Sequence, residues 1–219
     1  DGLIKGKIPI TGVLGDSHAA LFGQKCFQRG MAKATYGTGS SIAMNIGDQY
    51  QMSKKGIVTS IGWGIKDQIK YIYEGNIHAT GATIKWLVNK LNIISNSNNS
   101  EQLAKRVEDN GGVYFVPAFV GLGAPYWNNN VKATIKGITF DTEKAHIVRA
   151  ALEAIAYQIR DVVDLMVNES GIKLKEIRVD GVPTSNDFLM QFQSDLFFEF
   201  FELVKTILWQ NELPREQNS

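Results

Sequence analysis

The sequence predicts an α/β fold in which a mixed sheet with hairpins is flanked by helices. The first third of the chain consists of strand-like segments separated by glycines and polar breaks. A long amphipathic helix is expected around residue 150, and a strand, a glycine turn and a second helical pattern follow from Ile177. A helix that is apolar on one face has to cover a sheet, so these observations together favour the α/β class.

The early strands are expected to form two hairpins. The turn Gly37-Thr38-Gly39 lies between two of them, and Lys66–Gln68 joins two others, which places the glycine turn at a tight edge of the sheet. The strand-like segments are Ile8–Val13, Met31–Tyr36, Ser41–Ile46, Ile57–Ile65 and Ile69–Glu74.

The middle of the chain alternates between helical and extended patterns. Apolar residues at helical spacing follow Ile77, and Ser100 is the expected N-cap of a short helix that stops at Asn110–Gly112. Val113–Val116 is expected to be a buried strand and Val131–Ile135 an edge strand, with a Gly/Pro/Asn loop between them.

The clearest helix is expected to begin at a cap formed by Asp141 or Thr142 and to end at Ser170-Gly171. Its apolar residues recur at spacings of three and four: Val148, Ala151, Leu152, Ile155, Ile159, Val162, Val163 and Met166. The strand Ile177–Gly181 and the helix from Asn186 follow. Because ligands of open α/β sheets lie beyond the carboxyl ends of strands, near helix N-termini, this arrangement is typical of a nucleotide site.

A lone carboxylate and a glycine-rich loop lie close together in the sequence. Asp16 stands in the stretch Gly15–Gly23, and the polar loop Thr35–Ser41 follows within about twenty residues. A carboxylate can deprotonate an acceptor hydroxyl, and glycines let backbone N–H groups approach phosphate oxygens. The pair indicates phosphoryl transfer, by a kinase or by a phosphatase.

Composition excludes several classes of protein. The 219 residues are 44% apolar and carry a formal charge of +1, and no basic cluster is interleaved with aromatic residues, so nucleic acid is not an expected partner. The single cysteine, Cys26, rules out an internal disulfide framework and a cysteine-based zinc site. No apolar run has the length of a membrane span. A cytoplasmic location is expected, and the absence of a starting methionine suggests a piece of a longer protein.

Five blocks of the sequence resemble the FGGY-type carbohydrate and polyol kinases, specifically the C-terminal, ATP-binding half, and are closest to the glycerol kinases among them. The blocks are Gly15–Gln24, Met31–Gly39, Tyr114–Trp127, Ala145–Asp161 and Val179–Asp195. The resemblance implies an actin-like, ribonuclease H-like domain over residues 1–196 that forms one wall of a cleft. It also implies a missing N-terminal kinase half, ATP and Mg²⁺ between the halves, and a small sugar or polyol as the acceptor. A homo-oligomer is a further implied assembly.

The resemblance also implies roles for individual residues. Asp16 matches the catalytic base that accepts the proton of the acceptor hydroxyl as it attacks the γ-phosphate of Mg-ATP. Three residues, Gly37, Thr38 and Gly39, match the loop that contacts the phosphates. Gly81 matches a second nucleotide contact, through exposed N–H groups at the start of its helix. The residues that match the border of the adenine are Gly181 and Asn186. No metal-ligating constellation of protein side chains is expected.

Each of these roles has a structural alternative. Asp16 fits a helix N-cap, Gly37–Gly39 a simple hairpin turn, and Gly81 close helix packing. His18 fits a structural or solvent-facing role. Tyr126 and Trp127 fit either stacking on a ligand or anchoring of their own loop.

Two other functions are weighed against a kinase. One is a non-catalytic nucleotide-binding or interaction module, a truncated remnant of a kinase. The other is a phosphatase-like or chaperone-like member of the wider actin-like superfamily, against which the block Gly121–Trp127 argues.

The chain departs from the family pattern at three places. Gly181-Val182-Pro183 stands where the family usually has two glycines before the adenine-contacting Asn, and Asp16-Ser17-His18 replaces the Asp-Gln-Gln typical of glycerol kinases. The second change tells against glycerol as the acceptor. Residues 197–219 form a divergent tail that is not expected to return to the sheet. With the first half of the cleft missing, the chain alone is expected to be inactive or weak.

Overall fold

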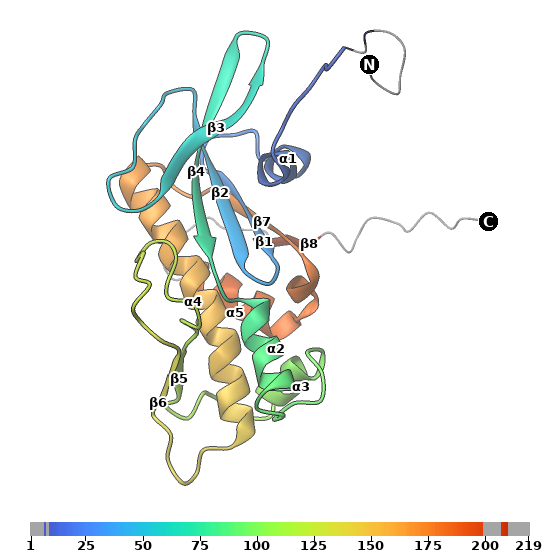
Figure 1. Ribbon diagram of the computed structural model, residues 1–219, viewed down its shortest axis with the longest axis vertical. Coiled ribbons are helices and arrows are strands. Elements are labelled where there is room, and N and C mark those ends of the chain that lie inside the picture. The colour runs from blue at the N-terminus through green and yellow to red at the C-terminus, as the bar shows by residue number, and fades with distance from the viewer. Residues whose placement is uncertain (1–6, 8, 199–206, 210–219) are drawn as a thin grey trace, which may run out of the picture.

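The computed structural model describes residues 7, 9–198 and 207–209. A six-stranded mixed sheet in the order β3-β4-β2-β1-β7-β8 forms its centre, and Figure 1 shows the β3–β4 hairpin extending beyond the other strands. β1 pairs antiparallel with β2 and parallel with β7. The strands of this sheet are β1 Met31–Tyr36, β2 Ser40–Gly47, β3 Val58–Ile65, β4 Gln68–Ile77, β7 Glu176–Asp180 and β8 Ile207–Trp209. The two expected hairpins are therefore confirmed.

The helices and a small second sheet complete the described part of the chain. A two-stranded antiparallel sheet consists of β5 and β6. No helix in the described ranges is both long enough and apolar enough to cross a membrane. The remaining elements are α1 Asp16–Gly23, α2 Gly81–Asn89, α3 Asn99–Ala104, β5 Tyr114–Val116, β6 Thr134–Lys136, α4 Lys144–Ser170, the 3₁₀ turn η1 Val182–Ser185 and α5 Asp187–Phe198.

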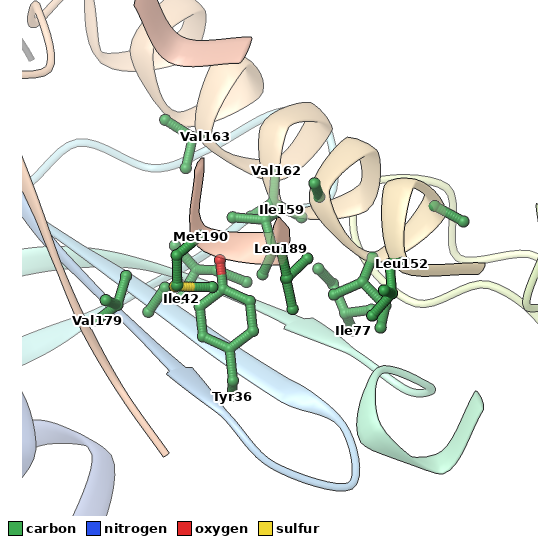
Figure 2. Packing of buried hydrophobic residues seen from close by; sticks show 14 of the residues in the cluster. Tyr36, Ile42, Ile77, Leu152, Ile159, Val162, Val163, Val179, Leu189 and Met190 are labelled. Atoms are coloured by element: carbon green, nitrogen blue, oxygen red, sulfur yellow. The ribbon is translucent and has the colours of Figure 1, made fainter. Parts of the chain in front are cut away.

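The central sheet is covered on both faces, as the alternation of β1 shows. Ala32, Ala34 and Tyr36 belong to the large core under α4 and α5, whereas Met31 packs with Leu21 of α1 in a smaller cluster. Figure 2 shows Leu152, Ile159 and Val162 of α4 above the sheet, near Tyr36 and Ile42. The long amphipathic helix therefore covers the sheet as its apolar spacing predicted.

Two predictions about extended segments are wrong. Residues 9–13 form no strand, because they pair with no neighbour, and Ile10 and Val13 are 84% and 86% exposed. The tail was expected not to return to the sheet, yet Ile207–Trp209 pairs with β7 in parallel, with Ile177 opposite Ile207. That pairing covers backbone N–H and C=O groups that an edge strand would leave open. The rest of the tail, residues 199–206 and 210–219, lies outside the described residues.

The helix starts also differ from expectation. α4 begins after Glu143 rather than at Asp141 or Thr142, and the Glu143 N–H donates to Nδ1 of His146 at 3.0 Å. The Thr142 hydroxyl instead accepts the Thr139 N–H in the preceding turn. Ser100 lies inside α3, where its hydroxyl donates to the carbonyl of Ser97.

The helix ends are closer to expectation. α4 ends as predicted, at Gly171 in the left-handed conformation with φ 66°. At the C-terminal end, α5 continues across the predicted boundary at residue 196, and Phe197 is buried in the core.

Candidate functional site

A cavity of about 500 Å³ opens where the β1–β2 turn meets the starts of α2 and α5. Its apolar wall is formed mainly by side chains of α2, α4 and α5, and its polar groups come from the turns, from α3 and from Lys85 of α2. This size and this mixture are typical of a small-molecule site. The lining residues that matter below are Gly37, Thr38, Gly81, Lys85, Pro183 and Asn186.

The Gly37–Gly39 turn is locked to the start of α2. The carbonyl of Gly37 accepts the N–H of Gly81, and the carbonyl of Thr38 accepts the N–H of Ala82, each at 3.0 Å. Thr38 is exposed, and the N–H groups of Thr38 and Gly39 make no hydrogen bond to any other described residue. Two backbone donors and one hydroxyl of this turn are therefore left for an anionic ligand.

Gly81 lines the cavity but does not offer the free N–H that the sequence predicted. Its N–H is used by Gly37, and a Cβ at this position would lie 2.6 Å from the Gly37 carbonyl oxygen. Close helix packing, the structural alternative, thus explains this glycine. The N–H groups at the start of α2 are thus bonded to the turn and are not free, whereas a nucleotide contact at Gly81 stays a prediction.

Gly39 and Gly181 do not line the cavity, yet each allows the backbone to pack closely beside it. A Cβ on Gly39 would lie 2.3 Å from the carbonyl oxygen of Ile77, at the end of β4. Gly181 has a φ of 99°, and a Cβ there would lie 1.9 Å from the carbonyl oxygen of Tyr36. Both positions require glycine, for steric reasons at Gly39 and for steric and conformational reasons at Gly181.

Asn186 is held rigidly at the cavity wall. Its Oδ1 accepts the Leu189 N–H at 2.9 Å, which caps α5, and its Nδ2 donates to the Ser100 hydroxyl at 3.2 Å. Val182 and Pro183 also line the cavity, so the departure from the family's paired glycines lies in the wall itself.

Lys85 is a cavity residue that the sequence reasoning missed. It lies four residues after Gly81 on α2, so both share one face of the helix. This spacing of four residues from Gly81 is the feature of the sequence that could have identified Lys85 as a cavity residue. It places an exposed cation at the cavity that begins at the Gly37–Gly39 turn.

Asp16 lies outside the cavity lining but is connected to the same turn. It is exposed in the first turn of α1, where its Oδ1 accepts the Ser17 N–H at 2.7 Å. The Ser17 hydroxyl lies 2.9 Å from the hydroxyl of Ser41, two residues after Gly39. The start of α1 and the glycine turn are therefore joined through a pair of serines.

Charged groups gather on the sheet face beneath α1. Lys33 is buried there, and burial lowers its pKa, although the nearby carboxylates of Asp180, Glu74 and Asp16 oppose that shift. His18 lies with Nε2 3.4 Å from both the Ser60 hydroxyl and a Glu74 carboxylate oxygen. His18 therefore holds α1 against β3 and β4, which agrees with the structural role weighed for it.

Tyr126 and Trp127 anchor their loop and do not line the cavity. The Trp127 Nε1–H donates to the Gly56 carbonyl at 2.5 Å, and the Tyr126 hydroxyl donates to Asp161 at 2.9 Å. Burial and this second bond raise the pKa of Tyr126 to about 12. Across the ranges that the structure describes, no three His, Cys, Asp or Glu side chains are grouped to hold a metal ion.

Comparison with known proteins places this geometry in a family. The sequence pattern of the FGGY family of carbohydrate kinases, C-terminal domain, matches residues 32–198. Glycerol kinase 2 of Thermotoga maritima is 56% identical over 190 residues, which are 87% of this chain and 38% of the relative. Glycerol kinase of Petrotoga mobilis is 54% identical with the same coverage. The chain thus spans about two fifths of the length of the curated relatives it matches.

Solved structures agree with the sequence comparison. A crystal structure of Plasmodium falciparum glycerol kinase with ADP matches with a TM-score of 0.81 at 42% identity, covering 85% of this chain and 37% of that one. A ligand-bound xylulose kinase from Lactobacillus acidophilus, at 19% identity and a TM-score of 0.74 over 84% of this chain and 36% of that one, supports the fold alone. The predicted actin-like class, a mixed sheet with flanking helices, is confirmed. The chain therefore belongs to the FGGY family of carbohydrate kinases and contains its C-terminal domain.

Proposed function

We propose that this chain is the nucleotide-binding half of an ATP-dependent sugar or polyol kinase that transfers the γ-phosphate of ATP to an acceptor hydroxyl. One observation carries the proposal. The cavity runs from the Gly37–Thr38 turn to Asn186, and Asp16 is joined to that same turn through Ser17 and Ser41. A nucleotide site and a proton acceptor thus meet at one edge of the sheet.

The cavity fits a nucleotide in shape and in chemistry. We assign the base to its apolar wall, to which Ile155 and Leu189 contribute, and Asn186 contacts Leu189 there. The phosphates then belong at the turn, where the free N–H groups of Thr38 and Gly39 and the Thr38 hydroxyl can donate to phosphate oxygens.

Mg²⁺ fits the same edge of the sheet. It usually keeps several of its waters and binds few protein ligands together with substrate phosphates, so it would be held mainly by the ATP phosphates and its waters beside the exposed carboxylate of Asp16. Bound there, Mg²⁺ would supply positive charge that neutralises the negative charge of the phosphates.

We assign Asp16 as the general base. Only its Oδ1 has a partner within the described part of the chain, the Ser17 N–H, so Oδ2 is free to take a proton from the acceptor hydroxyl. The first turn of α1 sets the direction of this carboxylate. The acceptor is a small sugar or polyol. Glycerol is one candidate because the curated relatives are glycerol kinases, whereas Ser17 and His18 beside the base tell against glycerol and leave the acceptor open.

The second wall of the cleft is assigned to an N-terminal kinase half, because the chain covers 38% of the length of its relatives. We therefore expect the chain alone to bind Mg-ATP but to turn it over weakly. The test is to add a separately produced N-terminal half from a relative and to screen glycerol, xylulose and related acceptors for ATP consumption. Acceptor-dependent turnover only in the mixture is the predicted result. Binding of Mg-ATP without turnover for any acceptor would favour the non-catalytic module instead.

A further inference from the structure

A buried lysine joins the two parts of the proposed site. The Lys33 side chain lies on β1, on the face toward α1, and the residue is 1% exposed. Its Nζ donates to Thr35 Oγ1 at 2.9 Å, Ser41 Oγ at 3.3 Å and Ser17 Oγ at 3.4 Å. All three ammonium protons can therefore be used by hydroxyl groups, which come from β1, β2 and α1.

The three hydroxyls that bind Lys33 lie next to the two parts of the proposed site. Thr35 and Ser41 are opposite each other in the β1–β2 register and lie on the two stems of the Gly37–Gly39 turn. Ser17 is the residue after Asp16. One ammonium group thus binds both stems of the phosphate turn and the first turn of the helix that carries the proposed base.

The first turn of α1 has few other restraints. Leu21 is the buried residue of this helix and lies in its second half, and the N-cap Gly15 provides no side-chain cap. Among the described residues, the other polar side-chain contacts near the start are Ser17 Oγ with Ser41 Oγ at 2.9 Å and His18 with Ser60 and Glu74. Because the first turn lacks a buried apolar anchor, its polar contacts decide where Asp16 lies.

Stability alone does not explain a lysine at this place. Burial of a cation is costly, and no described carboxylate forms an ion pair with Lys33. A methionine of similar length would fill the same volume without that cost, and replacement of buried charges by apolar residues is often neutral or stabilising. The charged group is therefore better explained by what it holds in place.

We propose that Lys33 is a positioning residue that fixes the distance between Asp16 and the Gly37–Gly39 turn through Ser17, Thr35 and Ser41. This inference rests on the proposed function only in the role it gives to Asp16. The link itself can be tested without any turnover.

The test is amide hydrogen exchange on the full chain, with Lys33→Met and Lys33→Arg compared with the unaltered protein. Lys33→Met is expected to speed exchange at Ala19–Leu21 by about tenfold or more, because the start of α1 loses a charge-assisted contact. Exchange in α4 should stay unchanged, and Lys33→Arg should restore much of the protection. As a matched control, Lys70→Met removes an ion-paired lysine from β4 and should leave α1 as it was.

Other outcomes would overturn the proposal. Unchanged exchange at α1 in Lys33→Met would show that the lysine does not hold this helix. Faster exchange throughout the sheet would show a purely structural role. If Lys33→Met does not fold, Ser17→Ala is compared with Ser41→Ala. The first change removes the contacts of α1 with both Lys33 and Ser41, and the second removes only the contact with Ser41, so α1 must exchange faster in Ser17→Ala.

With an N-terminal half added, Lys33→Met should lower kcat by about tenfold or more with little change in the KM for ATP. A rise in that KM at unchanged kcat would contradict the positioning role. If the unaltered chain binds no nucleotide, the proposed function fails, while the exchange experiment still decides whether Lys33 holds α1.

Discussion

Asp16→Asn is expected to lower the phosphotransfer rate of the kinase reassembled from both halves by about 10²- to 10⁴-fold. The carboxamide keeps the shape of the carboxylate and can still accept the Ser17 N–H, but it cannot accept the proton of the acceptor hydroxyl. Because Asp16 lies outside the cavity lining, the KM for ATP should change far less than kcat. Steady-state kinetics with acceptor and ATP varied separately measures both quantities.

Asp67→Asn is the matched control for this experiment. Asp67 is exposed in the turn of the β3–β4 hairpin, which extends away from the β1–β2 turn, so the reaction rate should stay at the unaltered value (Figure 1). Equal turnover in Asp16→Asn and in the unaltered protein would remove Asp16 from the mechanism. The site would then keep its nucleotide cavity and lose its proposed base.

Gly181→Ala is expected to lower the free energy of unfolding by about 3 kcal/mol or more and to weaken Mg-ATP binding. The new Cβ would lie 1.9 Å from the Tyr36 carbonyl oxygen, at a φ of 99° that L-residues rarely adopt. To relieve this clash, the end of β7 has to move away from the end of β1. Tyr36, Val182 and Pro183 lie at or just after these strand ends and line the cavity, so the movement would change the shape of the nucleotide site. Urea unfolding measures the stability, and calorimetry measures the binding.

Gly171→Ala separates the two causes of that loss. Gly171 also has a positive φ, 66°, but nothing lies within 4 Å of a Cβ built there. This change should therefore cost only the backbone strain, about 1–2 kcal/mol, and leave nucleotide binding intact. If both variants lose the same free energy of unfolding, the close approach of residue 181 to Tyr36 does not contribute to the loss.

The elements predicted best from the sequence are those whose apolar pattern reports their own burial. β1 alternates between two covered faces, and α4 repeats its apolar residues at helical spacing, so both were predicted from local pattern alone. Residues 9–13 look like a strand but have no neighbour to pair with, whereas residues 207–209 pair with β7. Pairing depends on parts of the chain distant in sequence, which a local pattern does not record.

The residues of the candidate site, too, were predicted only as far as local sequence pattern allows. Alternation along β1 places Lys33 on the face of Thr35, yet nothing local indicates that α1 covers that face and buries the ammonium group. The start of α2 was expected to offer exposed N–H groups, and the carbonyls of Gly37 and Thr38 accept those of Gly81 and Ala82 instead. The family resemblance named Gly37, Thr38, Gly81 and Asn186, which line the cavity, but also Gly39 and Gly181, which do not, and it missed Lys85. The contacts that fix these positions depend on tertiary packing.

Calorimetric titration of Mg-ATP into the chain alone, beside Gly39→Ala and Gly23→Ala, tests most directly whether the β1–β2 turn binds the phosphates. A Cβ on Gly39 would lie 2.3 Å from the Ile77 carbonyl oxygen and shift the turn, whereas a Cβ on Gly23 has open space. The account predicts saturable binding, an affinity weakened about tenfold or more in Gly39→Ala, and unchanged affinity in Gly23→Ala. No saturable heat from the unaltered chain, or equal affinity in Gly39→Ala, would contradict it.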